Sequence, residues 1–240
     1  MLAESQFPGT FHVFGLQGGG IDVGRINDGL IVRQDSDIEG FGDLRGKTIG
    51  TVPGIQWETI TRYLVREAGL NPDTDVEITG IGVALHVPSV VSGTVDATLS
   101  LEPVGSIADA AEETRRAVVN PVAQTIADPF YSGAAVLTTE FIEERPDVAR
   151  RVVLAIDEAT ELVNQDFESY KHLIPTYTAI EEAQLDLLAQ PYLRPFSDLN
   201  ETDFDSYQAF IDVFVSEGVL EERIDIREKI LDPALVGLDS

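Results

Sequence analysis

Short apolar runs of strand length punctuate the first half of the chain. They lie at Thr10–Gly15, Gly29–Arg33, Lys47–Thr51, Val76–Thr79 and Val95–Leu99. Runs this short, bounded by glycine, proline or polar residues, are typical of β-strands. The pattern therefore predicts a series of strands before residue 100.

Amphipathic segments separate these runs. From about Ile55 to Ala68, apolar residues recur at spacings of three, four and four, which is the periodicity of one helix face. Shorter helices are expected at Leu85–Ser92, which Gly93 would end, and at Pro103–Ala111. This alternation of strands and helices predicts an α/β fold with a mainly parallel sheet that is covered on both faces.

The second half of the chain is mostly helical. Strands are predicted at Ala117–Asn120 and Gly133–Thr138, and Pro146 suits the first turn of a long helix. Further helices are expected at Ala179–Ala189 and Asp203–Ser216.

Two of these helices carry an apolar stripe that should face the core. The stripe of the long helix is expected to be Val148, Val152, Ala155, Ala159 and Leu162. The stripe of the last helix is expected to be Phe204, Tyr207, Phe210, Ile211 and Phe214.

Composition fits a globular chain with a sizeable core. The 240 residues are 43% hydrophobic, which excludes wholesale disorder. No apolar run approaches the ~18–20 residues that span a bilayer, and the N-terminal residues lack the basic and apolar regions of a signal peptide. With no cysteine, disulfides, thiolate nucleophiles and Cys-ligated metals are excluded.

The charge is extreme for this length. Forty-two acidic residues against sixteen basic ones give −26, which repels phosphate backbones and anionic lipids and argues against nucleic-acid binding. The acids are dispersed, and only three of the basic residues are lysine. These features favour a halophilic protein, in which molar salt screens carboxylate repulsion within ~3 Å, over a protein with a cationic partner.

No metal or cofactor is predicted. His12, His86 and His172 are far apart with no metal-ligand spacing, so we expect structural roles for them. Asp35–Gly40 begins like a calcium loop, but the twelfth position is Gly46 rather than glutamate. An acidic turn ahead of a short helix is the better interpretation.

Three loops after predicted strands could approach a ligand. Thr51–Trp57 leads into a helix N-terminus, where free N–H groups and the helix dipole can hold an anion or a carbonyl. Trp57 could form an apolar wall there or belong to the core. Gln17–Gly20 is either a flexible loop or a surface where backbone meets ligand. Glu102 is either a ligand acceptor or a cap for the next helix.

In order and spacing, several segments resemble one family, type II periplasmic-binding-protein chains. The resemblance is carried by Asp43–Gly50, Ala68–Pro72, Ser92–Ala97, Glu102–Pro103, Glu140–Pro146 and Gly218–Leu235. Within that fold the chain is similar to the nitrate/sulfonate/taurine and thiamine-pyrimidine-precursor group of ABC-transporter substrate-binding proteins. The resemblance covers nearly the whole chain.

This resemblance implies two α/β lobes that are joined by two crossovers and close on a small ligand. Part of the first lobe would be residues 1–46, the second lobe residues 47–129, and residues 130–240 would return and complete the first lobe. Family chains begin with one or two further strand–helix units. We therefore expect an incomplete first lobe and an N-terminally truncated chain.

Ligand contacts follow from the resemblance by position. They are Gln17, Gly18, Gly19, Thr51, Gly54, Ile55, Gln56, Trp57, Glu102 and Tyr131. Members that select small anions often carry a hydroxyl residue where this chain has Ile55 and Gln56, which favours a bulkier or neutral ligand.

The function that the resemblance implies is non-enzymatic. The chain would be the solute-binding component of an ABC importer, with a membrane permease as its partner, and would work outside the membrane, membrane-associated in the complete protein. One alternative is an enzyme on the same fold, of the thiamine-pyrimidine or menaquinone type. The thiamine-pyrimidine type depends on a His-rich, Cys-containing site that this chain cannot assemble. A ligand-sensing regulatory domain is the other alternative.

Overall fold

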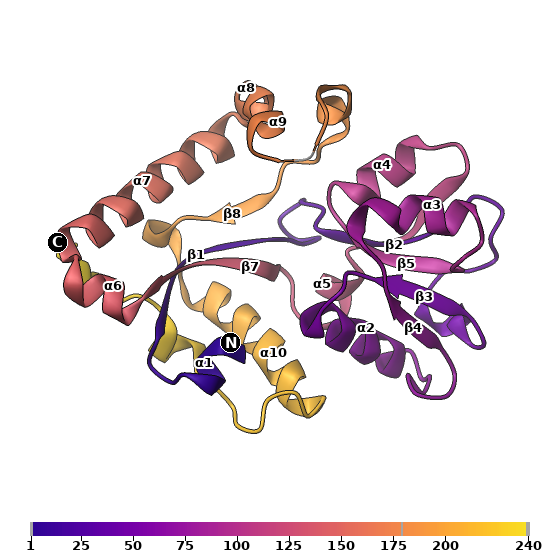
Figure 1. The fold of residues 1–240 in the computed structure, drawn as a ribbon, viewed down its shortest axis with the longest axis horizontal. Coiled ribbons are helices and arrows are strands. Elements are labelled where there is room, and N and C mark those ends of the chain that lie inside the picture. The colour runs from indigo at the N-terminus through magenta and orange to yellow at the C-terminus, as the bar shows by residue number, and fades with distance from the viewer. Residues whose placement is uncertain (1, 179, 239–240) are drawn as a thin grey trace.

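The chain forms two α/β lobes, each built on its own sheet (Figure 1). The computed structural model describes residues 2–178 and 180–238. The chain passes from the first lobe to the second between Gly19 and Asp28, and it returns between Val119 and Phe130. Two crossovers therefore join the lobes.

The second lobe contains a five-stranded sheet in the order β4-β3-β5-β2-β6. Its strands are β2 (Asp28–Arg33), β3 (Thr48–Thr51), β4 (Glu77–Gly80), β5 (Ala97–Leu101) and β6 (Thr114–Val119). Strand β3 runs parallel to β4 and β5, whereas β2 is antiparallel to both of its neighbours.

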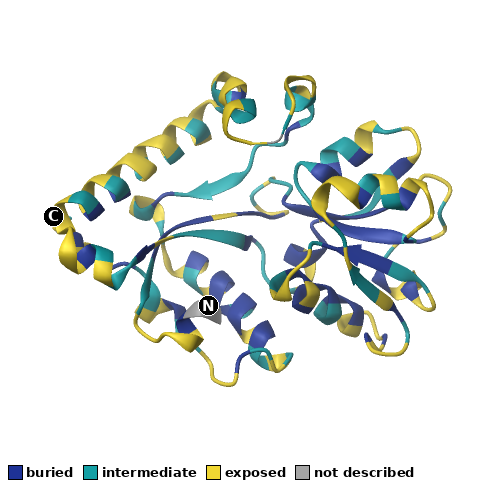
Figure 2. Ribbon diagram, in the orientation of Figure 1, coloured by how far each residue is buried: buried dark blue, intermediate teal, exposed yellow. Residues whose placement is uncertain are grey.

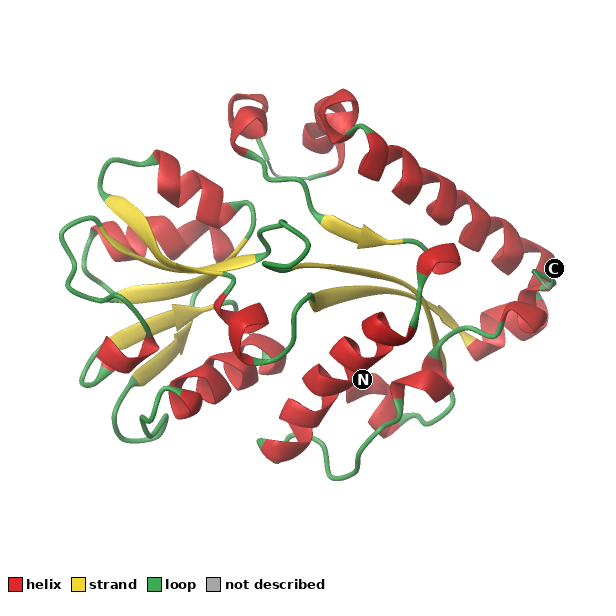
Figure 3. Ribbon diagram, turned by 180° about the vertical axis from the view of Figure 1, so that it is seen from behind, coloured by secondary structure: helices red, strands yellow, loops and turns green. Residues whose placement is uncertain are grey.

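Helices cover both faces of this sheet (Figure 3). They are α2 (Ile55–Glu67) and α5 (Pro121–Thr125) on one face, and α3 (His86–Val91) and α4 (Val104–Ala110) on the other. Because side chains alternate along a strand, β5 sends Leu99 into the apolar core and Ser100 towards His86 of α3.

The first lobe contains a three-stranded antiparallel sheet in the order β7-β1-β8. Its strands are β1 (Phe11–Gly19), β7 (Phe130–Thr138) and β8 (Tyr192–Arg194). The long helices α7 (Pro146–Gln165) and α10 (Glu201–Ser216) flank it on opposite sides (Figure 1).

Short helices complete the chain. The α-helical ones are α1 (Leu2–Gln6), α6 (Thr139–Glu144), α8 (Phe167–Tyr170) and α9 (Ile174–Tyr177). The 3₁₀ turns are η1 (Phe41–Leu44), η2 (Val83–Leu85), η3 (Lys171–Leu173), η4 (Glu182–Leu187), η5 (Phe196–Asp198), η6 (Ile226–Lys229) and η7 (Pro233–Val236). Within the described ranges, no helix combines the length and apolar character needed to cross a membrane.

The α/β fold and most predicted elements are confirmed, but the sheets are mixed rather than mainly parallel. Parallel pairing is limited to the strands that helical crossovers connect, namely β3, β4 and β5. Strands β2 and β7 enter their sheets from the inter-lobe crossovers instead, and they pair antiparallel. Strand β2 also lies inside the second-lobe sheet, although residues 1–46 were expected in the first lobe.

The long helix α7 buries a different and shorter line of residues than expected. Ala149 and Val153 are its buried residues, whereas Leu162 is 42% exposed. Ala155 and Ala159 are exposed too. Figure 2 shows that burial on α7 is concentrated in its N-terminal half. The expected stripe is therefore wrong as a buried surface, because only that half packs against β1, β7 and the C-terminal segment.

The helix expected at Ala179–Ala189 is instead the 3₁₀ turn η4. Ala179 itself lies outside the described residues. Strand β8 was not predicted, because three residues are too few to show a period.

One apolar cluster runs through both lobes along α2 and α10. Phe210 packs edge-to-face on Phe130 of β7 and on Phe214, with ring centroids 5.1 and 5.0 Å apart. The same cluster contains Trp57 and Ile60 of α2. This seam fixes one side of the junction between the lobes.

Replacing Phe210 with alanine should lower the free energy of unfolding by about 3–5 kcal/mol, because it leaves a cavity in the seam. Urea unfolding would measure this loss. Leu154→Ala is the matched control, since Leu154 is 44% exposed on α7 and should cost about 0.5 kcal/mol or less. Equal losses of unfolding free energy for the two substitutions would contradict a stabilising role of the seam.

Candidate functional site

The parallel strands of the second lobe end at the edge that faces the first lobe. Open α/β sheets bind ligands beyond the carboxyl ends of such strands. The loop after β3 leads into α2 through Gly54, which has a φ of 119° and provides no capping side chain. Free N–H groups of the first turn of α2 therefore lie at this edge.

The two crossovers are bonded to each other by the side chain of Asn120. Its Oδ1 accepts from the Asn27 N–H at 2.8 Å and from the Asp28 N–H at 3.4 Å. Its Nδ2 donates to the Arg25 carbonyl at 2.9 Å. Asn120 has a φ of 49°, a left-handed conformation that asparagine tolerates better than most residues.

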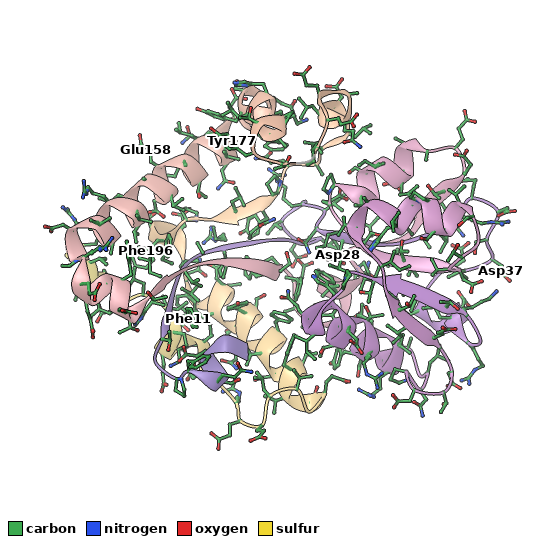
Figure 4. All side chains as sticks on the ribbon, viewed as in Figure 1. Phe11, Asp28, Asp37, Glu158, Tyr177 and Phe196 are labelled. Atoms are coloured by element: carbon green, nitrogen blue, oxygen red, sulfur yellow. The ribbon has the colours of Figure 1, made fainter. Side chains whose placement is uncertain are left out.

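Asp28 is fully buried at this junction, where Figure 4 labels it. It accepts from the Val122 N–H at 3.1 Å and from Asn27 Nδ2 at 2.9 Å. Burial raises the pKa of the Asp28 carboxyl to about 6, against these hydrogen bonds and the charge of Arg116, which lower it.

Asp128, on the return crossover, clamps the hairpin that the chain forms at 20–25. Its Oδ2 accepts from the N–H groups of Ile21 and Asp22 at 2.9 and 3.1 Å. A Cβ on Gly20 would lie 1.9 Å from Asp128 Oδ1, and one on Gly18 would lie 1.8 Å from the Phe130 carbonyl oxygen. The glycines at 18 and 20 therefore serve close packing of the crossovers.

Polar side chains bridge the lobes next to this clamp. Gln56 of α2 donates from Nε2 to the Ser132 carbonyl at 3.0 Å, and the Ser132 hydroxyl donates to Asn27 Oδ1 at 3.0 Å. The exposed Gln17 side chain lies over Gly133, whose added Cβ would be 3.4 Å from Gln17 Oε1. Two amides and a hydroxyl thus gather where β1 and β7 meet α2.

Some of the residues expected to contact a ligand are accessible to solvent, whereas others are buried and bonded within the protein. Gln17, Gly54 and Ile55 are exposed, and Gln56 is half-buried. The Thr51 hydroxyl is buried between Thr61 and the Trp57 carbonyl.

Trp57 belongs to the core rather than to a ligand wall. Its side chain is 7% exposed and joins the apolar seam.

Glu102 caps a helix and forms an ion pair. Its Oε1 accepts from Arg116 Nη1 at 2.7 Å, and its Oε2 accepts from the N–H and hydroxyl of Ser106 in α4. Of the two expected roles of Glu102, ligand acceptor or helix cap, its contacts match the helix cap.

Tyr131 faces α10 rather than the junction. It is fully buried, its hydroxyl donates to Asp203, and its ring stacks on Tyr192 at 6.1 Å. Burial, followed by the hydrogen bond to Asp203 and then the Asp203 charge, raises the pKa of the Tyr131 hydroxyl. Tyr131 therefore presents no surface to a ligand here.

Sequence reasoning missed the polar residues that tie the junction together: Asn27, Asp28, Asn120, Asp128 and Ser132. One signal was available, since Asn27 and Asp28 directly precede the apolar run Gly29–Arg33. Another was Asn120 before Pro121, a combination typical of a helix start. In the part of the chain that the structure describes, no three His, Asp or Glu side chains are grouped to hold a metal ion.

Comparison with protein families identifies the chain. Residues 23–168, more than half of the chain, match the NMT1/THI5 like family. The chain therefore belongs to this family.

One curated relative is a protein of Brucella abortus whose name describes it as a binding protein. It is 23% identical over 205 residues, which cover 80% of this chain. The chain spans 63% of the length of that relative.

Solved structures show which proteins share the fold. The periplasmic aliphatic sulphonate binding protein SsuA of Escherichia coli matches with a TM-score of 0.71 and 19% identity, over 97% of this chain and 72% of SsuA. The desulfurization enzyme DSZB matches with a TM-score of 0.70 and 16% identity, over 99% of this chain and 81% of DSZB. The fold is that of periplasmic binding proteins, and at least one enzyme uses it.

Substituting Asp28 with asparagine should remove a pH dependence of stability. Because the pKa is raised from 3.8 to about 6 on folding, stabilisation by the protonated carboxyl is fully present below pH 3.8 and lost as the pH rises through about 6. The wild-type free energy of unfolding should fall by up to about 3 kcal/mol across this window relative to the variant.

Urea unfolding at a series of pH values would measure the difference. Asp37→Asn is the control, since Asp37 is exposed and its replacement removes the same charge. If the free energy of unfolding depends on pH in the same way for wild type and Asp28→Asn, burial of Asp28 does not raise its pKa as described.

Proposed function

We propose that this chain is the solute-binding component of an ABC importer and captures one small organic or anionic solute between its lobes. Sulfonate-, nitrate-, taurine- or pyrimidine-like solutes are the candidates. One observation carries the proposal: the uncapped N-terminus of α2 and the amides of Gln17 and Gln56 converge beside the bonded crossovers. The family and the fold of SsuA support it.

Solute recognition would combine a helix end with side-chain hydrogen bonds. The first turn of α2 supplies N–H donors and the positive end of the helix dipole. Gln17 and Gln56 can both donate and accept. Ile55, half exposed at the start of α2, supplies an apolar contact. Such a mixture suits a small solute with a polar group and an apolar body.

Importers of this kind place the binding protein outside the cytoplasmic membrane, where it delivers solute to a permease. That location and that partner are part of the proposal for the complete protein. The acidic surface would keep the protein soluble in molar salt, as in a halophile.

Turnover of the solute is the second candidate function, because DSZB shares the fold. The buried histidine of α3 does not favour it. His86 is 1% exposed, with its ring nitrogens bonded to Ser100 Oγ and the Ile81 carbonyl. Burial lowers the pKa of His86, so its ring is held neutral inside the second lobe.

A thermal-shift panel in molar KCl tests the proposed function. It would contain alkylsulfonates, taurine, nitrate, bicarbonate, pyrimidine precursors and small carboxylates. A solute at a hundred times its Kd should stabilise the folded chain by about 2.7 kcal/mol. Gln56→Ala should weaken the shift, because it removes an amide from the site.

The matched control is Gln165→Ala, at the exposed C-terminal end of α7. Equal shifts for the two variants would place the solute elsewhere. A panel without any shift, from a chain that melts cooperatively, would contradict solute binding.

A further inference from the structure

Most cationic side chains of this acidic protein are paired with carboxylates. Twelve of the sixteen Lys and Arg side chains lie within ion-pair distance of an Asp or Glu. Within the described residues, the cations without such a partner are Arg25, Arg145, Arg150 and Arg151. Three of these lie at or near the start of α7. Arg25 is the one at the junction of the lobes.

The backbone of Arg25 is fixed at the base of the inter-lobe hairpin. Its N–H and carbonyl bond with those of Gly20 at 3.0 and 2.7 Å. The same carbonyl also accepts from Asn120 Nδ2, and Asp128 clamps the tip of the hairpin. The side chain therefore starts from a rigid position, which lowers the entropy lost on binding.

The Arg25 guanidinium has only neutral partners. Nη2 donates to Gln190 Oε1 at 3.1 Å, and Nη1 donates to the Gly24 carbonyl at 3.3 Å. Gln190 belongs to the first lobe, just before β8, and is itself held by the Asn164 carbonyl. A guanidinium has five N–H donors, so three are left over in a half-buried position.

A guanidinium fork matches the geometry of carboxylate and sulfonate groups. The chain contains 42 carboxylates, yet none of the described ones pairs with Arg25. We propose that Arg25 binds the anionic group of the captured solute through its free N–H donors, while Gln190 holds the guanidinium in place. This assignment rests on the proposed solute-binding function and adds a residue and a charge class to it.

The charges around Arg25 further limit the class of solute. The Arg25 guanidinium supplies a single positive charge, and Asp22 and Asp128 lie on the same hairpin and its clamp. A second negative charge on the solute would be repelled. The solute class is therefore a monoanion or a zwitterion with one oxygen-rich anionic group.

Calorimetric titrations at one fixed KCl concentration test the assignment. The probes are 1-butanesulfonate, butanoate and nitrate, with butanamide as an uncharged probe. Arg25→Gln should weaken binding of the anion that binds wild type best by about tenfold or more. It should leave any binding of butanamide unchanged. Arg25→Lys, which keeps the charge but loses the fork, should fall in between.

Arg151→Gln is the matched control, because it removes the same charge from the exposed surface of α7. It should bind anions as wild type does. If Arg25→Gln does not fold, Arg25→Lys is compared with Arg151→Lys instead. Weaker anion binding by Arg25→Lys alone supports the assignment, and equal anion binding by the two variants contradicts it.

Two results would overturn the assignment while leaving solute binding intact. One is an Arg25→Gln variant that binds anions as tightly as wild type, and the other is a wild type that binds butanamide but none of the anions. A wild type that binds none of these probes, nor any solute of the thermal-shift panel, would overturn solute binding and the assignment together.

Discussion

The contact between the two crossovers is the constraint on which the rest of the structure depends. Each lobe has its own sheet, and the chain passes between the lobes twice. Asn120 joins the two passages through three backbone groups, and Asp128 fixes the hairpin of the first passage. Because these bonds join the two passages directly, they set where the edge of the second sheet lies against the strands of the first lobe.

This constraint carries an energetic cost. Asp28 is ionisable and fully buried, and its two hydrogen bonds do not offset the loss of water, as its raised pKa shows. The apolar seam between α2 and α10 supports the junction from one side. Buried ionisable groups of this kind are common at functional sites, where stability is exchanged for geometry.

Sequence periodicity predicted the elements well and their assembly less well. The stripe of α2 and the aromatic residues of α10 are regular, so these helices were predicted close to their observed bounds. Strand β2 was assigned to the wrong lobe, because an apolar run does not say which sheet it joins. The stripe of α7 was misjudged because burial depends on what lies opposite a helix, and the helix sequence does not contain that information.

The candidate site shows the same limit. Gln17, Gly54, Ile55 and Gln56 were expected as ligand contacts from the resemblance; they are accessible in the structure, and their contact with a ligand stays a prediction. Trp57 and Tyr131 could not be separated from them, because an aromatic residue suits a ligand wall and a core equally well. Asn27 and Asn120 are more than ninety residues apart, and only the fold brings them together.

The most direct test of the account is a crystal structure of the chain grown with the solute that gives the largest thermal shift. The account predicts one solute between the lobes, in contact with the first turn of α2 and with Gln17 or Gln56. A solute bound elsewhere on either lobe, with this junction empty, would contradict it.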